Sequence, residues 1–191
     1  CWSLTTLLKI SNVQAKCKMS KSLRFAVIGT GFWADYQISA WKELEGTELV
    51  ALYNRTKSKA EILAHKFKVP NVYDNVEALL GNERLDFVDI ITDVDTHAPF
   101  TEMAARKGIS VICQKPMAPK LHIARQMLNV CNDLKVPFYI HENWRWQSPI
   151  RKLKECLLSN EIGKIFKARV TFCNAFPVFD KSLLHFIFRR F

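Results

Sequence analysis

The sequence predicts an α/β fold in which a parallel sheet is covered by helices on both faces. Short apolar runs that are typical of buried strands alternate along the chain with segments of helical spacing. The connections between them are short, which implies right-handed crossovers and a doubly wound parallel sheet. The first apolar run, LRFAVI, leads into a glycine-rich turn, GTGFWA, at residues 29–34.

This turn joins an expected strand at residues 23–28 to an expected helix at residues 32–44. Gly29 and Gly31 allow a tight bend at positions where a Cβ would block a nearby phosphate, and the amides at the start of the helix would favour an anion. The pattern alone also fits an ordinary strand-to-helix turn, but the alternating context favours a dinucleotide-binding fold. Apolar positions of the helix are Phe32, Trp33, Tyr36, Ile38 and Trp41.

The later elements follow in the same alternation. Further strands are expected at residues 48–53, 69–73, 85–91, 109–113 and 137–140. Helices are expected at residues 57–67, 96–107 and 119–134, and a short one ends at Gly81. Asp74 and Glu77 have the spacing of a capping box for that short helix. No internal repeat interrupts the pattern.

Charge and composition favour an enzyme domain over a nucleic-acid-binding protein. The net charge is +10, with 28 basic and 18 acidic residues. Seven of the basic residues lie in the two ends of the chain, which contain no acid: Lys9, Lys16, Lys18, Lys21, Lys181, Arg189 and Arg190. The remainder has a net charge of +3 and no basic-aromatic motif. We therefore expect no nucleic-acid partner.

The cysteines indicate that the protein resides in a reducing compartment, and the apolar runs give no sign of a membrane span. The six cysteines are scattered without a C-x-x-C pair, and no metal site is expected. Cys113 ends an apolar run and is expected in the core. No apolar run reaches the length of a membrane span, about 20 residues. These features favour a cytoplasmic protein.

Four motifs in order, GTGFWA at 29–34, THA at 96–98, QKPMA at 114–118 and NWRWQSP at 143–149, resemble the glucose-fructose oxidoreductase, inositol dehydrogenase and rhizopine-catabolism family (Gfo/Idh/MocA). The resemblance implies a Rossmann domain followed by an α+β domain with an open antiparallel sheet. It implies an NAD(P)-dependent oxidoreductase that acts on sugars, polyols and related hydroxyl compounds. It further implies a homo-oligomer that forms through the second-domain sheet.

The resemblance also assigns roles to individual positions. The pyrophosphate-binding turn would comprise Gly29, Thr30, Gly31, Phe32 and Trp33. Lys115 matches the lysine of the family's Glu-Lys-Pro motif, beside nicotinamide and substrate, where an ammonium stabilises a developing alkoxide. Burial could also adapt this lysine for proton transfer. The family's glutamate is Gln114 here, which removes a negative charge beside Lys115. The Lys115–Pro116 bond is a candidate for the cis form.

Three other residues have a structural alternative beside the functional one. His97 begins a helix after the fourth strand, where it could border the nicotinamide end of the cofactor or cap the helix. Asn143 and Arg145 match the family's Asn-x-Arg segment, which faces the substrate cleft. Arg145 could bind substrate oxygens or fix the domain junction by ionic hydrogen bonds, and the structural role is favoured.

The end of the second strand bears on cofactor choice. An acidic residue there would bind the adenosine ribose and repel a 2′-phosphate. This chain has Asn54 and Arg55 instead, followed by Lys57 and Lys59. A guanidinium can pair with a phosphate through two hydrogen bonds. NADP is therefore favoured, with NAD as the alternative.

The domain organisation is expected to comprise three parts. Residues 1–22 form an extra, disordered segment, read either as upstream sequence before Met19 or as a transit peptide. Residues 23–143 form the dinucleotide-binding domain. Residues 144–191 begin a truncated substrate domain with a helix at 147–158 and a strand at 164–176, and the family's Asp-x-Gly-x-x-His segment has no match in residues 180–191. The alternatives to an oxidoreductase are a non-catalytic nucleotide-binding or regulatory protein and an inactive gene fragment.

Overall fold

The computed structural model describes residues 22–143, 146–169 and 171, and the chain divides after Asn143 into two units that are described separately. The strands are β1 (Leu23–Ile28), β2 (Thr47–Tyr53), β3 (Asn71–Tyr73), β4 (Phe87–Ile90), β5 (Ser110–Gln114) and β6 (Phe138–His141). The helices of the same unit are α2 (Phe32–Lys42), α3 (Lys57–Phe67), α4 (Val76–Asn82), the 3-10 turn η1 (Val94–Thr96), α5 (His97–Arg106) and α6 (Leu121–Asp133). The elements expected in this region are confirmed, with small shifts at their ends.

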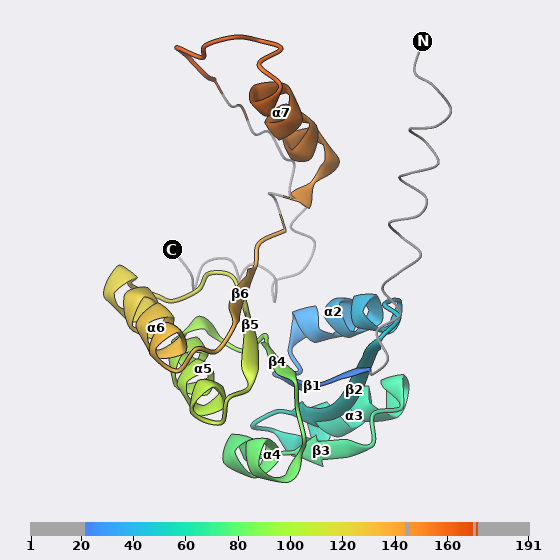
Figure 1. Ribbon diagram of the computed structural model, residues 1–191. Helices are drawn as coiled ribbons and strands as arrows, with labels where there is room; N and C mark the ends of the chain where they lie inside the picture. Colours follow the sequence, from blue (N-terminus) through green and yellow to red (C-terminus); the bar gives the residue numbers. More distant parts are fainter. Residues whose placement is uncertain (1–21, 144–145, 170, 172–191) are drawn as a thin grey trace. The chain divides into compact units, whose positions relative to one another are not determined.

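The strands of the first unit form a six-stranded sheet in the order β3-β2-β1-β4-β5-β6, and every neighbouring pair is parallel. The predicted doubly wound α/β fold is therefore confirmed. The chain runs outward from β1 through β2 to β3 and then returns to the other side of β1 as β4 (Figure 1). This reversal is the topological switch point, where ligands bind in open α/β sheets.

Helices cover the two faces of the sheet in separate layers. On one face α2 and α3 pack against β1 and β2 through Ala34, Ile38, Ala60 and Ala64. On the other face α4, α5 and α6 contribute to a second core. Alternate residues of a strand point to opposite faces, so each strand supplies apolar side chains to both cores.

An aromatic cluster fixes α2 against the middle of the sheet. The rings of Phe25 on β1 and Phe87 on β4 stack with their centroids 4.7 Å apart and 5° between their planes. The Trp41 ring of α2 lies 4.9 Å from that of Phe25. Burying one large apolar side chain is worth about 1.5–3 kcal/mol. This cluster therefore anchors α2 to the strands on both sides of the switch point.

The predicted capping box at Asp74 and Glu77 is wrong. Asn75 is the N-cap of α4, and its side-chain oxygen accepts a hydrogen bond from the backbone N–H of Ala78 at 2.8 Å. The cap must be the extended residue directly before the first helical one, and α4 begins at Val76. Asp74 lies one residue too early in the chain for this role.

The second unit contains α7 (Ser148–Leu158), which has a proline in its first turn. This helix agrees with the expectation from the sequence. The strand expected at residues 164–176 is not formed in the described part, residues 164–169 and 171. A strand needs a hydrogen-bonded neighbour, and no other strand occurs among the described residues of this unit. The remainder of that prediction lies outside the described residues.

Among the described residues, no helix is both long and apolar enough to cross a membrane.

Candidate functional site

The predicted cofactor and catalytic residues of the first unit lie after the carboxyl ends of parallel strands. The glycine turn follows β1, Asn54 and Arg55 follow β2, and Lys115 follows β5. Because all neighbouring strands are parallel, these ends meet at the same edge of the sheet. This edge includes the switch point between β1 and β4.

Gly29 is required by the fold itself. Its φ is +115°, in the region that favours glycine. A Cβ there would lie 2.9 Å from Thr92 Cγ2 and 3.0 Å from the carbonyl carbon of Ile91. The backbone N–H of Gly29 donates to the Tyr53 carbonyl oxygen at 2.9 Å. This glycine lets the turn pass close to the residues that follow β4.

Gly31 has the opposite surroundings. It is the N-cap of α2 with φ −82°, which any residue can adopt, and its backbone makes no unusual demand. Apart from its two neighbours in the chain, none of the described residues lies within 4 Å of a Cβ built on Gly31. The first N–H groups of a helix have no partner within the helix. The space beside Gly31 is therefore open to a ligand group that approaches the backbone closely.

Thr30 and Asn54 connect the glycine turn to the loop after β2. The backbone N–H of Thr30 donates to Asn54 Oδ1 at 3.3 Å, and Asn54 Nδ2 donates to the Thr56 carbonyl oxygen at 3.0 Å. The Thr30 hydroxyl is buried and has no hydrogen-bond partner among the described residues. Asn54 thus shapes the turn, and the Thr30 hydroxyl is left available for a bound group.

Arg55 is exposed, as are Lys57 and Lys59 at the start of α3. In the described part of the chain, Arg55 forms no ion pair or hydrogen bond. Its guanidinium is therefore available to an anion beside the end of β2.

The aromatic residues at the start of α2 do not form a buried face. Phe32 and Trp33 are 59% and 46% exposed, and Tyr36 is 59% exposed. Their rings contact one another with centroid distances of 5.5–5.9 Å. The buried residues of α2 are Ala34 and Ile38. A group bound at the turn would therefore contact Phe32 or Trp33 through their backbone or through these exposed rings.

His97 is buried and links two loops of the site edge. Its Nδ1 lies 3.1 Å from the Pro116 carbonyl oxygen and 3.3 Å from that of Met117, while its Nε2 lies 3.1 Å from the Thr92 carbonyl oxygen. The residue is 1% exposed; its backbone N–H caps the end of η1 by donating to the Val94 carbonyl oxygen, while the N-cap of α5 is Thr96. This geometry gives no support to direct contact between His97 and a cofactor. Instead the ring ties the Lys115–Pro116 loop to the loop that packs on Gly29.

Lys115 is exposed and precedes a cis peptide bond to Pro116, as the sequence suggested. Its backbone N–H donates to Gln114 Oε1 at 2.7 Å. Proton transfer by this lysine would require a buried side chain, and the described residues do not bury it. Its ammonium can act as a charge at the edge of the sheet.

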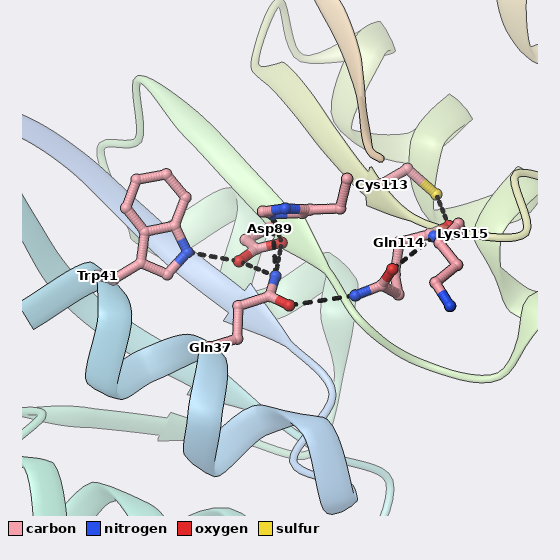
Figure 2. A network of polar contacts seen from close by, with 7 residues as sticks. Gln37, Trp41, Asp89, Cys113, Gln114 and Lys115 are labelled. Atoms are coloured by element: carbon pink, nitrogen blue, oxygen red, sulfur yellow. Dashed lines mark hydrogen bonds and ion pairs between the residues drawn. The ribbon is translucent and has the colours of Figure 1, made fainter. Parts of the chain in front are cut away.

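A partly buried polar network, centred on the buried Asp89, lies next to this lysine and was not foreseen from the sequence (Figure 2). The Asp89 carboxylate, fully buried on β4, accepts from Trp41 Nε1 at 2.7 Å and from Gln37 Nε2 at 2.6 and 2.8 Å. His141 Nε2 lies 3.3 Å from Asp89 Oδ1 and 3.0 Å from Gln37 Nε2. Gln114 Nε2 donates to Gln37 Oε1 at 3.2 Å.

The signal for this network was present in the sequence. Asp89 is a charged residue in the middle of the apolar strand LDFVDII, and a buried carboxylate needs donors. Gln37, Trp41 and His141 supply or could supply them, but they lie far away in the chain. Trp41 was expected only as an apolar position of α2.

Burial also shapes the chemistry of Cys113 on β5, which lies in the core as expected. Burial, together with the nearby negative charge of Asp89, raises the pKa of the Cys113 thiol from 9.0 to about 12. Burial likewise raises the pKa of Cys131. Neither thiol is suited to act as a nucleophile. In the described part of the chain, no group of three metal-ligating side chains is close enough to hold a metal ion.

The predicted substrate residues lie at the end of the first unit or beyond the described residues. Asn143 is exposed two residues after β6. Arg145 falls outside the described residues.

The chain is similar to known proteins in both sequence and structure. The model of a family described as an oxidoreductase family with an NAD-binding Rossmann fold, GFO_IDH_MocA, matches residues 23–141. A D-apiose dehydrogenase from Rhizobium rhizogenes is 38% identical over 158 residues, which cover 83% of this chain and 46% of that protein. The chain thus spans about half the length of this curated relative.

Two solved structures have the same fold. An oxidoreductase from Agrobacterium radiobacter, in complex with NAD+, L-tartaric acid and magnesium, is 38% identical with a TM-score of 0.73, and the match covers 75% of this chain and 42% of that one. An oxidoreductase from Desulfitobacterium hafniense that is named NADPH-dependent is 31% identical with a TM-score of 0.71, and the match covers 75% of this chain and 41% of that one.

Proposed function

The chain belongs to the oxidoreductase family with an NAD-binding Rossmann fold, and on this basis we propose that it binds a nicotinamide dinucleotide and transfers hydride to or from a sugar or polyol. The proposed substrate class follows the name of the D-apiose dehydrogenase relative and the polyhydroxy acid bound in the Agrobacterium structure. These compounds share a carbinol carbon flanked by further hydroxyl groups, which is the group we propose as the reacting centre.

The observation that carries the proposal is the open space at Gly31. In the part of the chain that the structure describes, a Cβ there would meet nothing within 4 Å beyond its chain neighbours, although the residue lies at the start of a helix and at the switch point of the sheet. The unpartnered hydroxyl of Thr30 adds a buried polar group beside it, since none of the described residues bonds to it. A pyrophosphate fits these residues, because it would accept hydrogen bonds from the α2 amides and from that hydroxyl.

Lys115 has the proposed catalytic role. A bound nicotinamide would supply the hydride acceptor or donor of the reaction. The Lys115 ammonium would stabilise the negative charge that develops on the substrate oxygen as the carbinol carbon loses its hydride. Gln114 holds the backbone of this lysine through one hydrogen bond. Asn143 remains a predicted substrate contact, and Arg145 keeps both predicted roles, substrate binding or the favoured structural one at the domain junction.

The cofactor that we propose is NADP in preference to NAD. Arg55 follows the strand whose end contacts the adenosine ribose in this fold, and it has no competing partner in the described residues. Asn54 uses its side-chain oxygen to hold Thr30, so Arg55 is the better candidate for reading a 2′-phosphate.

The cofactor assignment is tested by titrating the protein with NADPH and NADH and following the nicotinamide fluorescence. Arg55→Ala is expected to weaken NADPH binding by about tenfold or more and to leave NADH binding unchanged, because one charged hydrogen-bonding pair is lost. Lys42→Ala, which removes an exposed charge at the other end of α2, is the control. Equal losses for both cofactors would refute the NADP preference.

The activity is tested by offering aldoses, polyols and sugar acids with the oxidised cofactor and measuring NAD(P)H absorbance. Lys115→Met is expected to lower kcat by about 100-fold while cofactor affinity stays within about threefold. Lys120→Met changes another exposed lysine of the same loop and should have little effect. Equal turnover in both variants would remove Lys115 from the mechanism.

A non-catalytic nucleotide-binding protein is the second candidate function, favoured by one observation: an amide, Gln114, occupies the position of the family's glutamate. Saturable cofactor binding without turnover on any substrate of the panel would support this candidate.

A further inference from the structure

The network around Asp89 follows from strand alternation and register. Asp89, Gln114 and His141 all point to the sheet face that α2 covers, because their neighbours Val88, Cys113 and Ile140 belong to the core on the other face. Gln114 and His141 are register partners on β5 and β6. Gln37 of α2 lies between them and Asp89, with hydrogen-bond contacts to all three.

Asp89 fixes the orientation of the Gln37 amide. The indole Nε1 of Trp41 can only donate, so the Asp89 oxygen 2.7 Å away acts as an acceptor. The Gln37 group beside the carboxylate, at 2.6 and 2.8 Å, is therefore the NH2 donor. Its carbonyl oxygen is then forced to face Gln114.

The orientation of the Gln114 amide follows in the same way from that of Gln37. Its NH2 group faces Gln37 Oε1 at 3.2 Å, so its carbonyl oxygen faces the N–H of Lys115 at 2.7 Å. The Asp89 carboxylate thus determines, through this series of hydrogen bonds, which way each of the two amides is oriented. A glutamate at position 114 would have no hydrogen to offer Gln37 Oε1, so the amide at this position matches its neighbour.

We propose that Asp89 is a positioning residue for Lys115, acting through Gln37 and Gln114. The buried carboxylate sets the orientation of the Gln37 and Gln114 amides, and so keeps the Gln114 carbonyl oxygen on the backbone N–H of Lys115. This inference rests on the proposed function only for the chemical role of Lys115. The relay itself concerns the hydrogen-bond partner of the Lys115 backbone and can be tested without turnover.

The test is a cycle of three variants: Asp89→Asn, Gln114→Glu and the double variant. Asp89→Asn alone can keep the parent arrangement, because the new amide oxygen can take the position of Asp89 Oδ2, which accepts from both Trp41 at 2.7 Å and Gln37 at 2.6 Å. This variant is expected to keep kcat within about threefold of the parent. Gln114→Glu alone leaves Gln37 Oε1 facing a carboxylate that has no hydrogen to donate, and it is expected to lower kcat by about tenfold, with KM and cofactor affinity nearly unchanged. In the double variant Gln37 can turn, because the amide at position 89 can offer its NH2 group to Gln37 Oε1.

The decisive result is the double variant, which is expected to regain kcat to within about threefold of the parent. A double variant as slow as Gln114→Glu would overturn the relay. Gln37→Met, which removes the relaying amide and leaves Asp89 its contacts with Trp41 and His141, should lower kcat as much as Gln114→Glu does. A Gln37→Met variant with the parent's kcat would also overturn it. Thr101→Val, a buried change outside the network, is the control for folding.

Hydrogen exchange of the Lys115 amide, measured by NMR on the intact chain, gives a second readout that needs no activity. Exchange is expected to be faster in Gln37→Met, where Gln37 no longer holds the Gln114 carbonyl oxygen on the Lys115 N–H, and to match the parent rate in Thr101→Val. Unchanged exchange in Gln37→Met would refute the relay even in an active enzyme. Faster exchange in Gln37→Met in a protein without turnover would support the relay and count against the proposed function.

Discussion

The two halves of the site edge are built differently. At the glycine-turn side, after β1 and β2, the site consists mainly of backbone, and its connection to the next strand is the Thr30 to Asn54 hydrogen bond. At the lysine side it consists of side chains from β4, β5, β6 and α2. Gln37 of α2 pairs there with Asp89, Gln114 and His141, which lie 52, 77 and 104 residues away in the sequence.

The two halves should therefore tolerate different kinds of amino-acid substitution. A backbone site depends on conformations that only certain residues adopt, so one added methyl group can distort it. A side-chain relay depends on matched donors and acceptors, so it is sensitive to a single amide or carboxylate exchange that barely changes volume. Variants that change one half should therefore leave the other intact.

The largest effect is expected for Gly29→Ala in the backbone half. The new Cβ would need a left-handed conformation and would overlap Thr92 and the Ile91 carbonyl carbon. We expect a loss of about 4 kcal/mol in the free energy of unfolding, measured by urea denaturation. Gly81→Ala, in helix α4 with open space around it, is the control and should be neutral or slightly stabilising. Similar stability in the two variants would contradict the assigned role of Gly29.

A somewhat smaller effect is expected for His97→Ala, which breaks the link between the halves. The change leaves a cavity and removes the ring nitrogens that face the carbonyl oxygens of Thr92, Pro116 and Met117. We expect a loss of about 3 kcal/mol by the same measurement. Thr101→Val, where the buried hydroxyl has no partner in the described residues, should cost little. A His97→Ala protein as stable as Thr101→Val would show that the link is dispensable.

The smallest effect is a pH dependence in the side-chain half. The Cys113 thiol has a pKa near 9.0 when unfolded, but burial and Asp89 raise its folded pKa to about 12. The unfolded state therefore releases a proton first, and stability falls as the pH rises from about 9 to about 12. At a pH of about 10 the loss relative to Cys113→Val should be about 1 kcal/mol.

Asp89→Asn should lower the folded pKa of Cys113, because it removes the second cause of the shift. The alkaline loss of stability would then be smaller. Identical pH profiles for Cys113→Val and the parent, from unfolding curves at about pH 8 and about pH 10, would contradict the burial argument.

The backbone half of the site edge follows largely from local patterns in the sequence. The order of strands and helices, the fold class and the position of the glycine turn follow from local spacing. The motif could not distinguish the roles of its two glycines, because the contact of Gly29 with Ile91 and Thr92 depends on residues that follow a distant neighbouring strand. The aromatic residues of α2 were placed on the helix correctly, but their exposure depends on what covers them.

The side-chain half was predicted only at Lys115 and Pro116. Gln114 was recognised as a departure from the family, without its partner. Asp89 interrupts an apolar strand and was a visible signal, yet its donors come from α2 and β6, and no local pattern names them. The same limit applies to His97, whose ring contacts depend on how two loops meet.

The central claim is that the open space at Gly31 holds the cofactor, and one paired measurement tests it most directly. NADPH binding and the free energy of unfolding are measured for the parent and for Gly31→Ala. We expect binding weaker by about tenfold or more with a stability change below about 1 kcal/mol, because the new methyl group meets none of the described residues beyond its chain neighbours but occupies the ligand's space. Unchanged NADPH affinity in a stably folded Gly31→Ala protein would contradict it.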